Sequence, residues 1–234
     1  MEVVILCGGK GTRLRPVTEE IPKPMVTVAD KPVLWHIMNK YASHGHKDFI
    51  LCLGYKADVV KEYFDNDDNK GDGWNVVCVD TGEDSNKGER LFKVKDHIKG
   101  DEFLLAYGDD ISNVDIGKII EYHNERGKIV TLTAIRPISQ FGVMELENGD
   151  VTDFKEKPKL GVWINGGFYV IKKKIFDYLV DGADFESDAL KKLAEERQIS
   201  AYKHDGFWMC MNTQKDAEEL DKILRQDGNS YLLK

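Results

Sequence analysis

The strongest constraint on the fold of this chain is a pattern of four short apolar runs. Longer segments with helical spacing separate these runs. The runs are four or five residues long and lie at Val3–Cys7, Phe49–Leu53, Val76–Val79 and Phe103–Ala106. Uninterrupted runs of this length are typical of strands that are buried on both faces. Each run therefore predicts a buried strand of a parallel sheet.

The segments between these runs carry apolar residues at the three- and four-residue spacing of a helix. One set is followed by Gly45 as a helix stop, and another lies between Asp115 as a helix cap and Gly127 as a stop. Two of the apolar faces consist of Val33, Leu34, Ile37, Met38 and Tyr41, and of Val59, Val60, Tyr63 and Phe64. Strands that alternate with such helices form right-handed βαβ units. The prediction is an α/β protein with a Rossmann-like, mostly parallel sheet covered by helices.

The second half of the chain predicts a mixed sheet. Asn148-Gly149 is a strong turn signal for a hairpin between two strand-like segments. Glu83–Gly88 is expected to be a mobile polar loop. The expected strands are Val130–Ile135, Val143–Glu147 and Val151–Phe154, and a strand pair at Ile199–Tyr202 and Phe207–Met211 is flanked by helices around Ser187–Glu196 and Gln214–Arg225.

Composition excludes several classes of protein. The 234 residues are 41% hydrophobic and 32% charged, which is typical of a globular domain with its own core. The formal charge of -8, without a basic block, argues against a nucleic-acid partner. No apolar run approaches the ~20 residues needed to span a bilayer, so we expect a cytoplasmic protein without a membrane partner. The cysteines have no metal or disulfide spacing and are expected to be core residues: Cys7, Cys52, Cys78 and Cys210.

A glycine-rich loop follows the first predicted strand, where open α/β sheets bind their ligands. It reads Gly8-Gly9-Lys10-Gly11-Thr12-Arg13-Leu14. Glycines let backbone N–H groups approach a polyanion, and the basic side chains can bind phosphate oxygens. The loop fits neither the NTPase P-loop nor the dinucleotide fingerprint. It predicts a triphosphate site of another kind, and the alternative is a plain tight turn.

The chain resembles the sugar-1-phosphate nucleotidyltransferase family. The family signature L-x-G-G-x-G-T-R-L is matched over Leu6–Leu14, and the K-P that follows it is matched at Lys23. Within the family the chain is most similar to glucose-1-phosphate cytidylyltransferases, through segments that run from end to end. These include Lys31–Met38, Gly54–Lys56, Val79–Gly82, Tyr107–Asp109, Glu156–Lys159, Trp163–Phe168 and Tyr202–Trp208. The resemblance implies a glycosyltransferase-A-like fold in one domain over residues 1–234.

The resemblance also implies roles for individual residues. Arg13, Lys23 and Asp109 would be catalytic, and Asp109 would hold Mg²⁺ together with the residue at position 212. The nucleotide would be bound, with the base near the last four residues, by Leu6, Gly8, Gly9, Gly11, Thr12, Arg13, Lys23, Thr81, Gly82, Gly88 and Arg90. The acceptor would be bound by Glu156, Lys157, Asn165, Gly166 and Gly167. Asp110 is a weaker candidate, because adjacent side chains of an extended chain point in opposite directions.

Three departures from the family pattern bear on these roles. Asn212 stands where the family has its second metal-binding aspartate, so we expect weaker metal binding. The long insertion that glucose-1-phosphate enzymes carry between Phe64 and Trp74 is reduced here to a few polar residues. Glu89 replaces a glycine beside the arginine of the base loop.

The expected reaction is transfer of a nucleotidyl group from CTP to the phosphate of a small molecule, with release of pyrophosphate. Residues 1 to about 130 would bind the nucleotide and the remainder the acceptor. Glucose 1-phosphate is the default acceptor, and phosphoglutamine is an alternative. An alternative of another class is a non-catalytic regulatory subunit, suggested by Asn212. The resemblance also implies a homo-oligomer.

Overall fold

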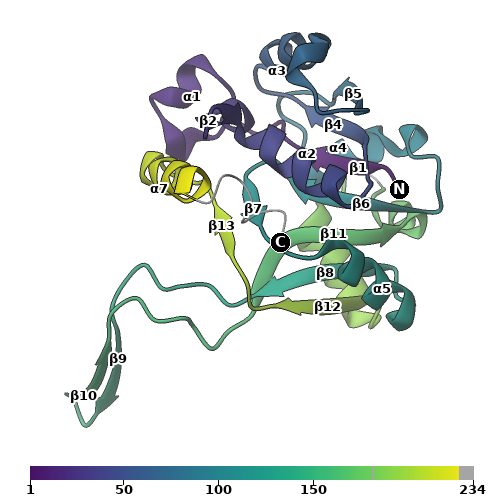
Figure 1. Cartoon of the computed structure of the whole chain (residues 1–234). Coiled ribbons are helices and arrows are strands. Elements are labelled where there is room, and N and C mark those ends of the chain that lie inside the picture. Colours follow the sequence, from purple (N-terminus) through teal and green to yellow (C-terminus); the bar gives the residue numbers. More distant parts are fainter. Residues whose placement is uncertain (181, 227–234) are drawn as a thin grey trace.

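A seven-stranded sheet forms the centre of the computed structural model, which describes residues 1–180 and 182–226 (Figure 1). Six of its strands run in one direction, and β11 runs antiparallel between β6 and β8. This is the mostly parallel mixed sheet that the sequence predicts. In spatial order the strands are β12 (Ile199–His204), β8 (Val130–Ile135), β11 (Ile164–Lys172), β6 (Glu102–Tyr107), β1 (Val3–Leu6), β4 (Asp48–Leu53) and β5 (Asn75–Asp80).

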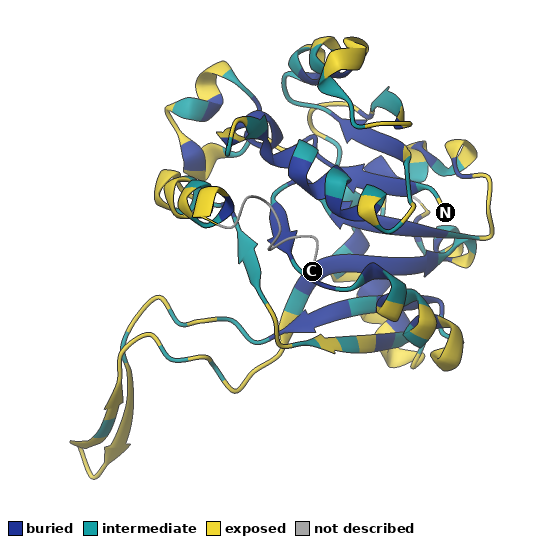
Figure 2. Ribbon diagram, viewed as in Figure 1, coloured by how far each residue is buried: buried dark blue, intermediate teal, exposed yellow. Residues whose placement is uncertain are grey.

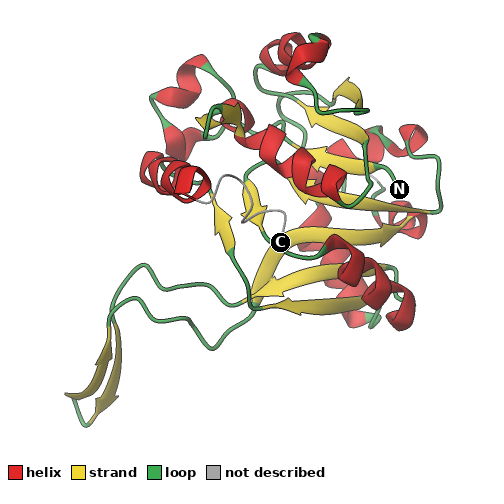
Figure 3. Cartoon of the chain, in the orientation of Figure 1, coloured by secondary structure: helices red, strands yellow, loops and turns green. Residues whose placement is uncertain are grey.

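Helices cover both faces of this sheet (Figure 3). The expected caps of one of them are confirmed: the Asp115 side chain accepts a hydrogen bond from the Lys118 N–H, and Gly127 ends the helix with a φ of 63°. The α-helices are α1 (Val17–Glu20), α2 (Val33–Ser43), α3 (Ala57–Asp65), α4 (Lys87–Lys93), α5 (Ile116–Arg126), α6 (Lys191–Glu195) and α7 (Gln214–Gln226). The 3-10 helices are η1 (Thr12–Leu14), η2 (Lys23–Met25), η3 (Asp67–Asn69), η4 (Lys95–His97) and η5 (Lys173–Tyr178), and η6 (Phe185–Leu190) is a π-helix. Within the described residues, no helix has the length and hydropathy needed to cross a membrane.

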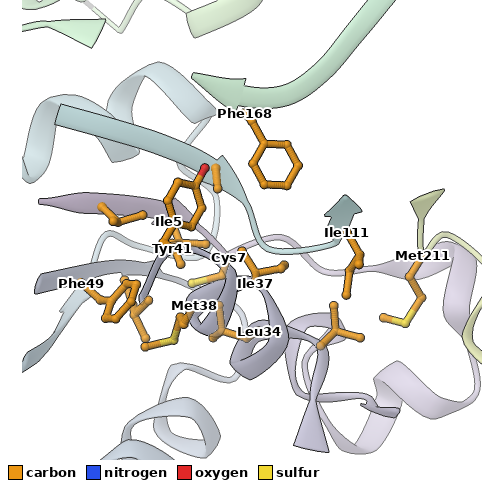
Figure 4. Close-up of a cluster of buried hydrophobic side chains, with 14 of the residues drawn as sticks. Ile5, Cys7, Leu34, Ile37, Met38, Tyr41, Phe49, Ile111, Phe168 and Met211 are labelled. Atoms are coloured by element: carbon orange, nitrogen blue, oxygen red, sulfur yellow. The ribbon is translucent and has the colours of Figure 1, made fainter. Parts of the chain in front are cut away.

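Alternating residues of the central strands supply two separate cores. Ile5 belongs to the core that contains apolar residues of α2, α3, α5 and α7, whereas Val4 belongs to the core under α4, η5, η6 and α6. In Figure 4, Tyr41 of α2 packs against the sheet beside Phe168 of β11, and the centroids of the two rings are 5.9 Å apart. These two cores hold the ends of the strands in fixed positions, which is what a binding site at those ends requires.

A hairpin arm, residues 136–163, projects from the body of the molecule (Figure 1). Its strands β9 (Val143–Glu147) and β10 (Asp150–Lys155) pair only with each other among the described residues, and the arm is mostly exposed (Figure 2). The predicted hairpin is confirmed, with positive φ at both Asn148 and Gly149. The hairpin forms a separate two-stranded sheet and contributes nothing to the central one.

Two further expectations about secondary structure are wrong. The segments at 199–202 and 207–211 do not pair with each other: β12 joins β8, and β13 (Trp208–Cys210) pairs with β7 (Asp110–Ser112). Strand pairing depends on which distant edge is free, and local spacing does not reveal this. The segment 83–88 is not all loop, because α4 begins at Lys87 with a capping box between Asn86 and Glu89. A smaller sheet joins β2 (Thr27–Val28) to β3 (Lys31–Pro32).

Candidate active site

A cleft of about 770 Å³ lies where β1 and β6 reach their carboxyl ends. It is lined by the glycine-rich loop after β1, the turn after β6, the start of β11, β13 and the start of α4. Ligands bind at this end of the strands in open α/β sheets. The lining residues that the sequence predicted are Leu6, Gly8, Gly9, Gly11, Arg13, Lys23, Arg90, Asp109, Asn165 and Asn212.

The glycine-rich loop is shaped by close contacts that exclude other residues. Gly11 has a φ of 59°, and an added Cβ would lie 2.8 Å from the Cβ of Lys23. The Thr18 hydroxyl donates a hydrogen bond to the Gly11 carbonyl and holds this turn. Arg13 is exposed and lines the cleft, whereas Thr12 is exposed and does not line it.

Lys23 is brought together with both predicted metal-binding residues. It begins η2 between Pro22 and Pro24, and its side chain is buried. The ammonium donates to Oδ2 of Asp109 and, over 3.0 Å, to Oδ1 of Asn212. A fixed cation therefore stands beside the groups that would hold a divalent ion.

The expectation that Asp110 points away from Asp109 is wrong. One ligand atom each of Asp109, Asp110 and Cys210 lies within 4.8 Å of the other two. The chain is not extended here: β6 ends at Tyr107, Gly108 and Asp109 form a turn, and β7 begins at Asp110. Burial raises the pKa of the Asp110 carboxyl, and the neighbouring Asp109 raises it further.

The expectation that every cysteine is a core residue is wrong for Cys210. Cys7 and Cys52 are buried in the two cores, and all four cysteines are free, as expected. Cys210 is half-buried and lines the cleft, where its sulfur accepts a hydrogen bond from Nδ2 of Asn212. Burial, Asp110 and Asp109 raise the pKa of the thiol. The hard donors at this point are the carboxylates and the amide oxygen of Asn212, a set that fits a divalent cation such as Mg²⁺.

The guanidinium of Arg90 links the loops after β1 and β5 to the last residue of β4 at the edge of the cleft. It is buried, and burial lowers its pKa. Its two terminal nitrogens donate hydrogen bonds of 2.8 to 3.2 Å to the carbonyl oxygens of Gly8, Leu53, Gly82 and Glu83 and to the hydroxyl of Thr81. Arg90 therefore supports the cleft by fixing the backbone around it.

Three other residues predicted to surround the base do not line the cleft. Thr81 and Gly82 contact Arg90 behind it. Gly88 packs in α4 so closely that an added Cβ would lie 2.0 Å from the carbonyl oxygen of Ala183. Glycine at this position thus permits the approach of α4 to the chain before η6.

The acceptor wall predicted around Asn165 forms a bulged start of β11. The register with β8 shifts between Asn165 and Tyr169, and the Asn165 side chain accepts a hydrogen bond from the Gly167 N–H. The Gly166 carbonyl accepts from Nε1 of Trp208 over 2.8 Å. These contacts place Asn165 in the wall of the cleft, with Gly166 and Gly167 buried behind it.

Glu156 and Lys157 are not brought to the cleft. Both are exposed in the hairpin arm directly after β10, where an ion pair of 4.0 Å joins them, and neither lines the cavity. The reason is that the arm extends away from the body (Figure 1). Proximity to this cleft could not be inferred from the Glu-Lys-Pro motif alone.

A polar network in the cleft was missed by the sequence reasoning. The Tyr107 hydroxyl donates to Oε1 of Glu186 over 2.6 Å and lies 2.7 Å from the Tyr169 hydroxyl. Lys87 forms an ion pair with Oε2 of the same glutamate. The N-x-x-E pattern of Asn86 and Glu89 could have predicted the helix that carries Lys87, but no local signal marks Glu186.

We expect Gly167→Ala to disrupt this site. Gly167 has a φ of 78°, and an added Cβ would lie 2.2 Å from Oδ2 of Asp110. The strain and the displaced carboxylate should lower the free energy of unfolding by about 1–3 kcal/mol, as measured by urea titration. Gly161→Ala is the control, because an added Cβ there meets nothing within 4 Å. Equal stability of the two variants would contradict the crowding around Asp110.

Comparison with known proteins agrees with this geometry. A family model described as nucleotidyl transferase matches residues 2–225. A protein of Salmonella typhi named glucose-1-phosphate cytidylyltransferase is 42% identical over 245 residues, with 95% of each chain covered. The solved structure of HddC from Yersinia pseudotuberculosis complexed with GMP-PN is similar with a TM-score of 0.73 and 27% identity, covering 95% of this chain and 99% of that one.

A solved structure of apo UDP-glucose pyrophosphorylase shares the fold with a TM-score of 0.75, at 19% identity and with 97% of this chain and 98% of that one covered. The fold and the match over nearly the whole chain define an enzyme class that moves nucleotidyl groups. The chain belongs to the nucleotidyl transferase family, as its glycine-rich loop and Lys23 indicated.

Proposed function

We propose that the enzyme transfers the cytidylyl group of CTP to the phosphate of glucose 1-phosphate and releases pyrophosphate. The observation that carries the proposal is the position of Lys23, Asp109 and Asn212 in one cluster beside the glycine-rich loop. The name of the Salmonella typhi relative supports the base and the acceptor. Phosphoglutamine is the alternative acceptor.

The proposed reaction is a single in-line displacement. An oxygen of the acceptor phosphate forms a bond to the α-phosphorus as the bond from that phosphorus to the β-phosphate oxygen breaks. Lys23 and Arg13 stabilise the negative charge that shifts onto the α-phosphoryl oxygens and the leaving pyrophosphate. Mg²⁺, when bound, would neutralise phosphate charge, and Asp109 and Asn212 would hold it.

The nucleotide and the acceptor are assigned to the two sides of the cleft. For the nucleotide we propose direct contacts from the glycine-rich loop, with Thr81, Gly82, Gly88 and Arg90 shaping the base pocket from behind. For the acceptor we propose Asn165, with Gly166 and Gly167 allowing close approach to the backbone. Glu156 and Lys157 can bind the acceptor only if the hairpin arm that carries them reaches a cleft.

We expect CTP to be the best nucleotide, because the segment from Thr81 to Arg90 matches cytidylyltransferases. Pyrophosphate release would be measured with CTP, UTP and dTTP, each with glucose 1-phosphate or phosphoglutamine as acceptor. A higher kcat/KM with UTP or dTTP contradicts the base assignment. If no combination releases pyrophosphate, the regulatory-subunit alternative is favoured.

We also propose that the enzyme is a homo-oligomer in which a second copy covers the hairpin arm. The arm exposes large apolar side chains, including Phe141 at 76%, Leu146 at 66% and Phe154 at 58%. An isolated two-stranded hairpin is only marginally stable in water, and exposed apolar groups of this density mark interfaces. Each arm would then carry Glu156 and Lys157 toward the cleft of a neighbouring copy.

Charged substitutions in the arm should dissociate this oligomer. We expect Leu146→Asp combined with Phe154→Asp to give a monomer in sedimentation analysis, because two buried carboxylates would oppose association. Glu147→Gln, on the same hairpin, is the matched control and should keep the native mass. A monomeric native protein would rule out the oligomer.

A further inference from the structure

The base of the cleft holds two carboxyl groups beside a single ammonium group. Asp109 and Asp110 approach each other there, and the ammonium of Lys23 is bonded to Asp109 and Asn212. The next cation along the wall, Lys87, is paired with Glu186. Within residues 1–180 and 182–226, Asp110 therefore has no ion-pair partner of its own.

Asp110 is buried and faces the cleft. Its exposed fraction is 5%, it lines the cavity, and no N–H or O–H group of the described residues donates a hydrogen bond to its carboxylate. The thiol of Cys210, a weak donor that also lies 3.8 Å from Oδ2 of Asp109, interacts with this carboxyl group. A buried carboxylate without a strong donor or a cation is costly, so a positively charged ligand at this point is strongly favoured.

The neighbouring chain leaves room for this carboxylate. Gly167 presents its Cα to Oδ2 of Asp110, and any larger residue there would collide with that oxygen. Strand pairing fixes the backbone of Asp110, because β7 pairs this residue with Cys210 of β13. The side chain is thus held at the cleft, beside the residue expected to bind the metal.

We infer that Asp110 is a ligand of the divalent cation and supplies the second carboxylate that Asn212 does not provide. This inference rests on the proposed nucleotidyl transfer, which requires a cation near the triphosphate. Oxygen ligands suit Mg²⁺ or Mn²⁺, whereas the soft sulfur of Cys210 does not, so Cys210 is left out of the proposed ligand set. Asn212 then offers the cation only a neutral oxygen, and it also orients Lys23 through their hydrogen bond.

The test is direct binding of Mn²⁺, followed by the electron paramagnetic resonance of the free ion, with and without α,β-methylene-CTP. The proteins are wild type, Asp110→Asn, Asn212→Ala and the double variant Asp110→Asn with Asn212→Asp. We expect Asp110→Asn to weaken binding about 10- to 100-fold, as loss of groups around metals does. Asn212→Ala should change it less, and the double variant should bind within about threefold of wild type because a carboxylate is restored.

Thermal unfolding gives a second readout that does not depend on activity. In EDTA, Asp110→Asn should unfold at a higher temperature than wild type, because the repulsion between two carboxylates is removed. Mn²⁺ should raise the unfolding temperature of wild type more than that of Asp110→Asn. If Asp110→Asn binds Mn²⁺ with wild-type affinity, the inference is overturned. The same holds if the only change in this variant is a raised KM for the acceptor. Absence of Mn²⁺ binding by wild type overturns it as well.

The two proposals fail in different ways. Pyrophosphate release from CTP with normal Mn²⁺ binding by Asp110→Asn leaves the proposed function intact and removes the role of Asp110. Weakened Mn²⁺ binding by Asp110→Asn, without pyrophosphate release from any nucleotide, keeps the metal ligand and removes the proposed function.

Discussion

Lys23→Ala is expected to slow turnover roughly 30- to 1000-fold, which corresponds to about 2–4 kcal/mol for one preorganised electrostatic donor. The reason is that the ammonium is buried and held in place by Asp109 and Asn212, so it needs little reorganisation when charge develops on the α-phosphoryl group. Nucleotide affinity should change less than turnover, because the interaction strengthens in the transition state. Steady-state kinetics and CTP binding measured by calorimetry would check both parts.

A second active-site variant and a surface control accompany this prediction. Arg13→Ala should also reduce kcat, since Arg13 lines the same part of the cleft. Lys118→Ala, on the exposed surface of α5, removes a cation far from the chemistry and should leave kcat unchanged. If Lys23→Ala keeps near-normal kcat while Asp109→Asn loses it, the ammonium only neutralises Asp109 in the resting enzyme.

Arg90→Ala is expected to lower the free energy of unfolding by about 3 kcal/mol, since hydrogen bonds to a charged group contribute about 1.5–3 kcal/mol each and water can replace part of them. The loss should lower Tm by roughly 6–12 °C for a domain of this size. The five bonds of the guanidinium reach the loops after β1 and β5 and the last residue of β4. Once they are released, the affinity for CTP should fall as well.

Arg90→Lys should not rescue this loss, because an ammonium has three donors and cannot match the planar fork of a guanidinium. Arg126→Ala is a suitable control, since that arginine is exposed at the end of α5. Calorimetric unfolding and CTP titration of the three variants provide the measurement. A Tm of Arg90→Ala equal to that of Arg126→Ala would show that the loops hold their positions unaided.

The parallel half of the fold could be predicted because β1, β4 and β6 are buried and appear as uninterrupted apolar runs. The run in β5 marks a strand too, but this strand lies at the edge of the sheet and is only half-buried. The helix caps at Asp115 and Gly127 could also be predicted, because each depends on local backbone geometry. Asp115 accepts a hydrogen bond from the first turn, and Gly127 adopts the left-handed conformation that ends the helix. β11 was not predicted as a strand, because Asn165-Gly166-Gly167 resembles a turn. Its extended shape depends on pairing with β6 and β8, which are distant in sequence.

The residues of the candidate site likewise fall into those that could be predicted from the sequence and those that could not. The glycine-rich loop and Lys23 are adjacent in sequence to their structural constraints, so their place in the cleft could be predicted. The position of Asp110 depends on a turn at Gly108 and on pairing with Cys210, and an alternating strand pattern gave the opposite direction. Glu186 lies in the cleft because of the way η6 packs, and no local signal in the sequence predicts this packing.

The guanidinium of Arg90 occupies space that two glycines leave open. An added Cβ at Gly8 would lie 2.1 Å from its Nη1, and one at Gly54 would lie 2.5 Å from the same atom. A side chain at either position is therefore incompatible with arginine at position 90, and removal of the arginine leaves a hollow beside both glycines. Such positions are coupled, so the effects of their substitutions do not add. In evolution the three positions should covary, with arginine retained only where both glycines are retained.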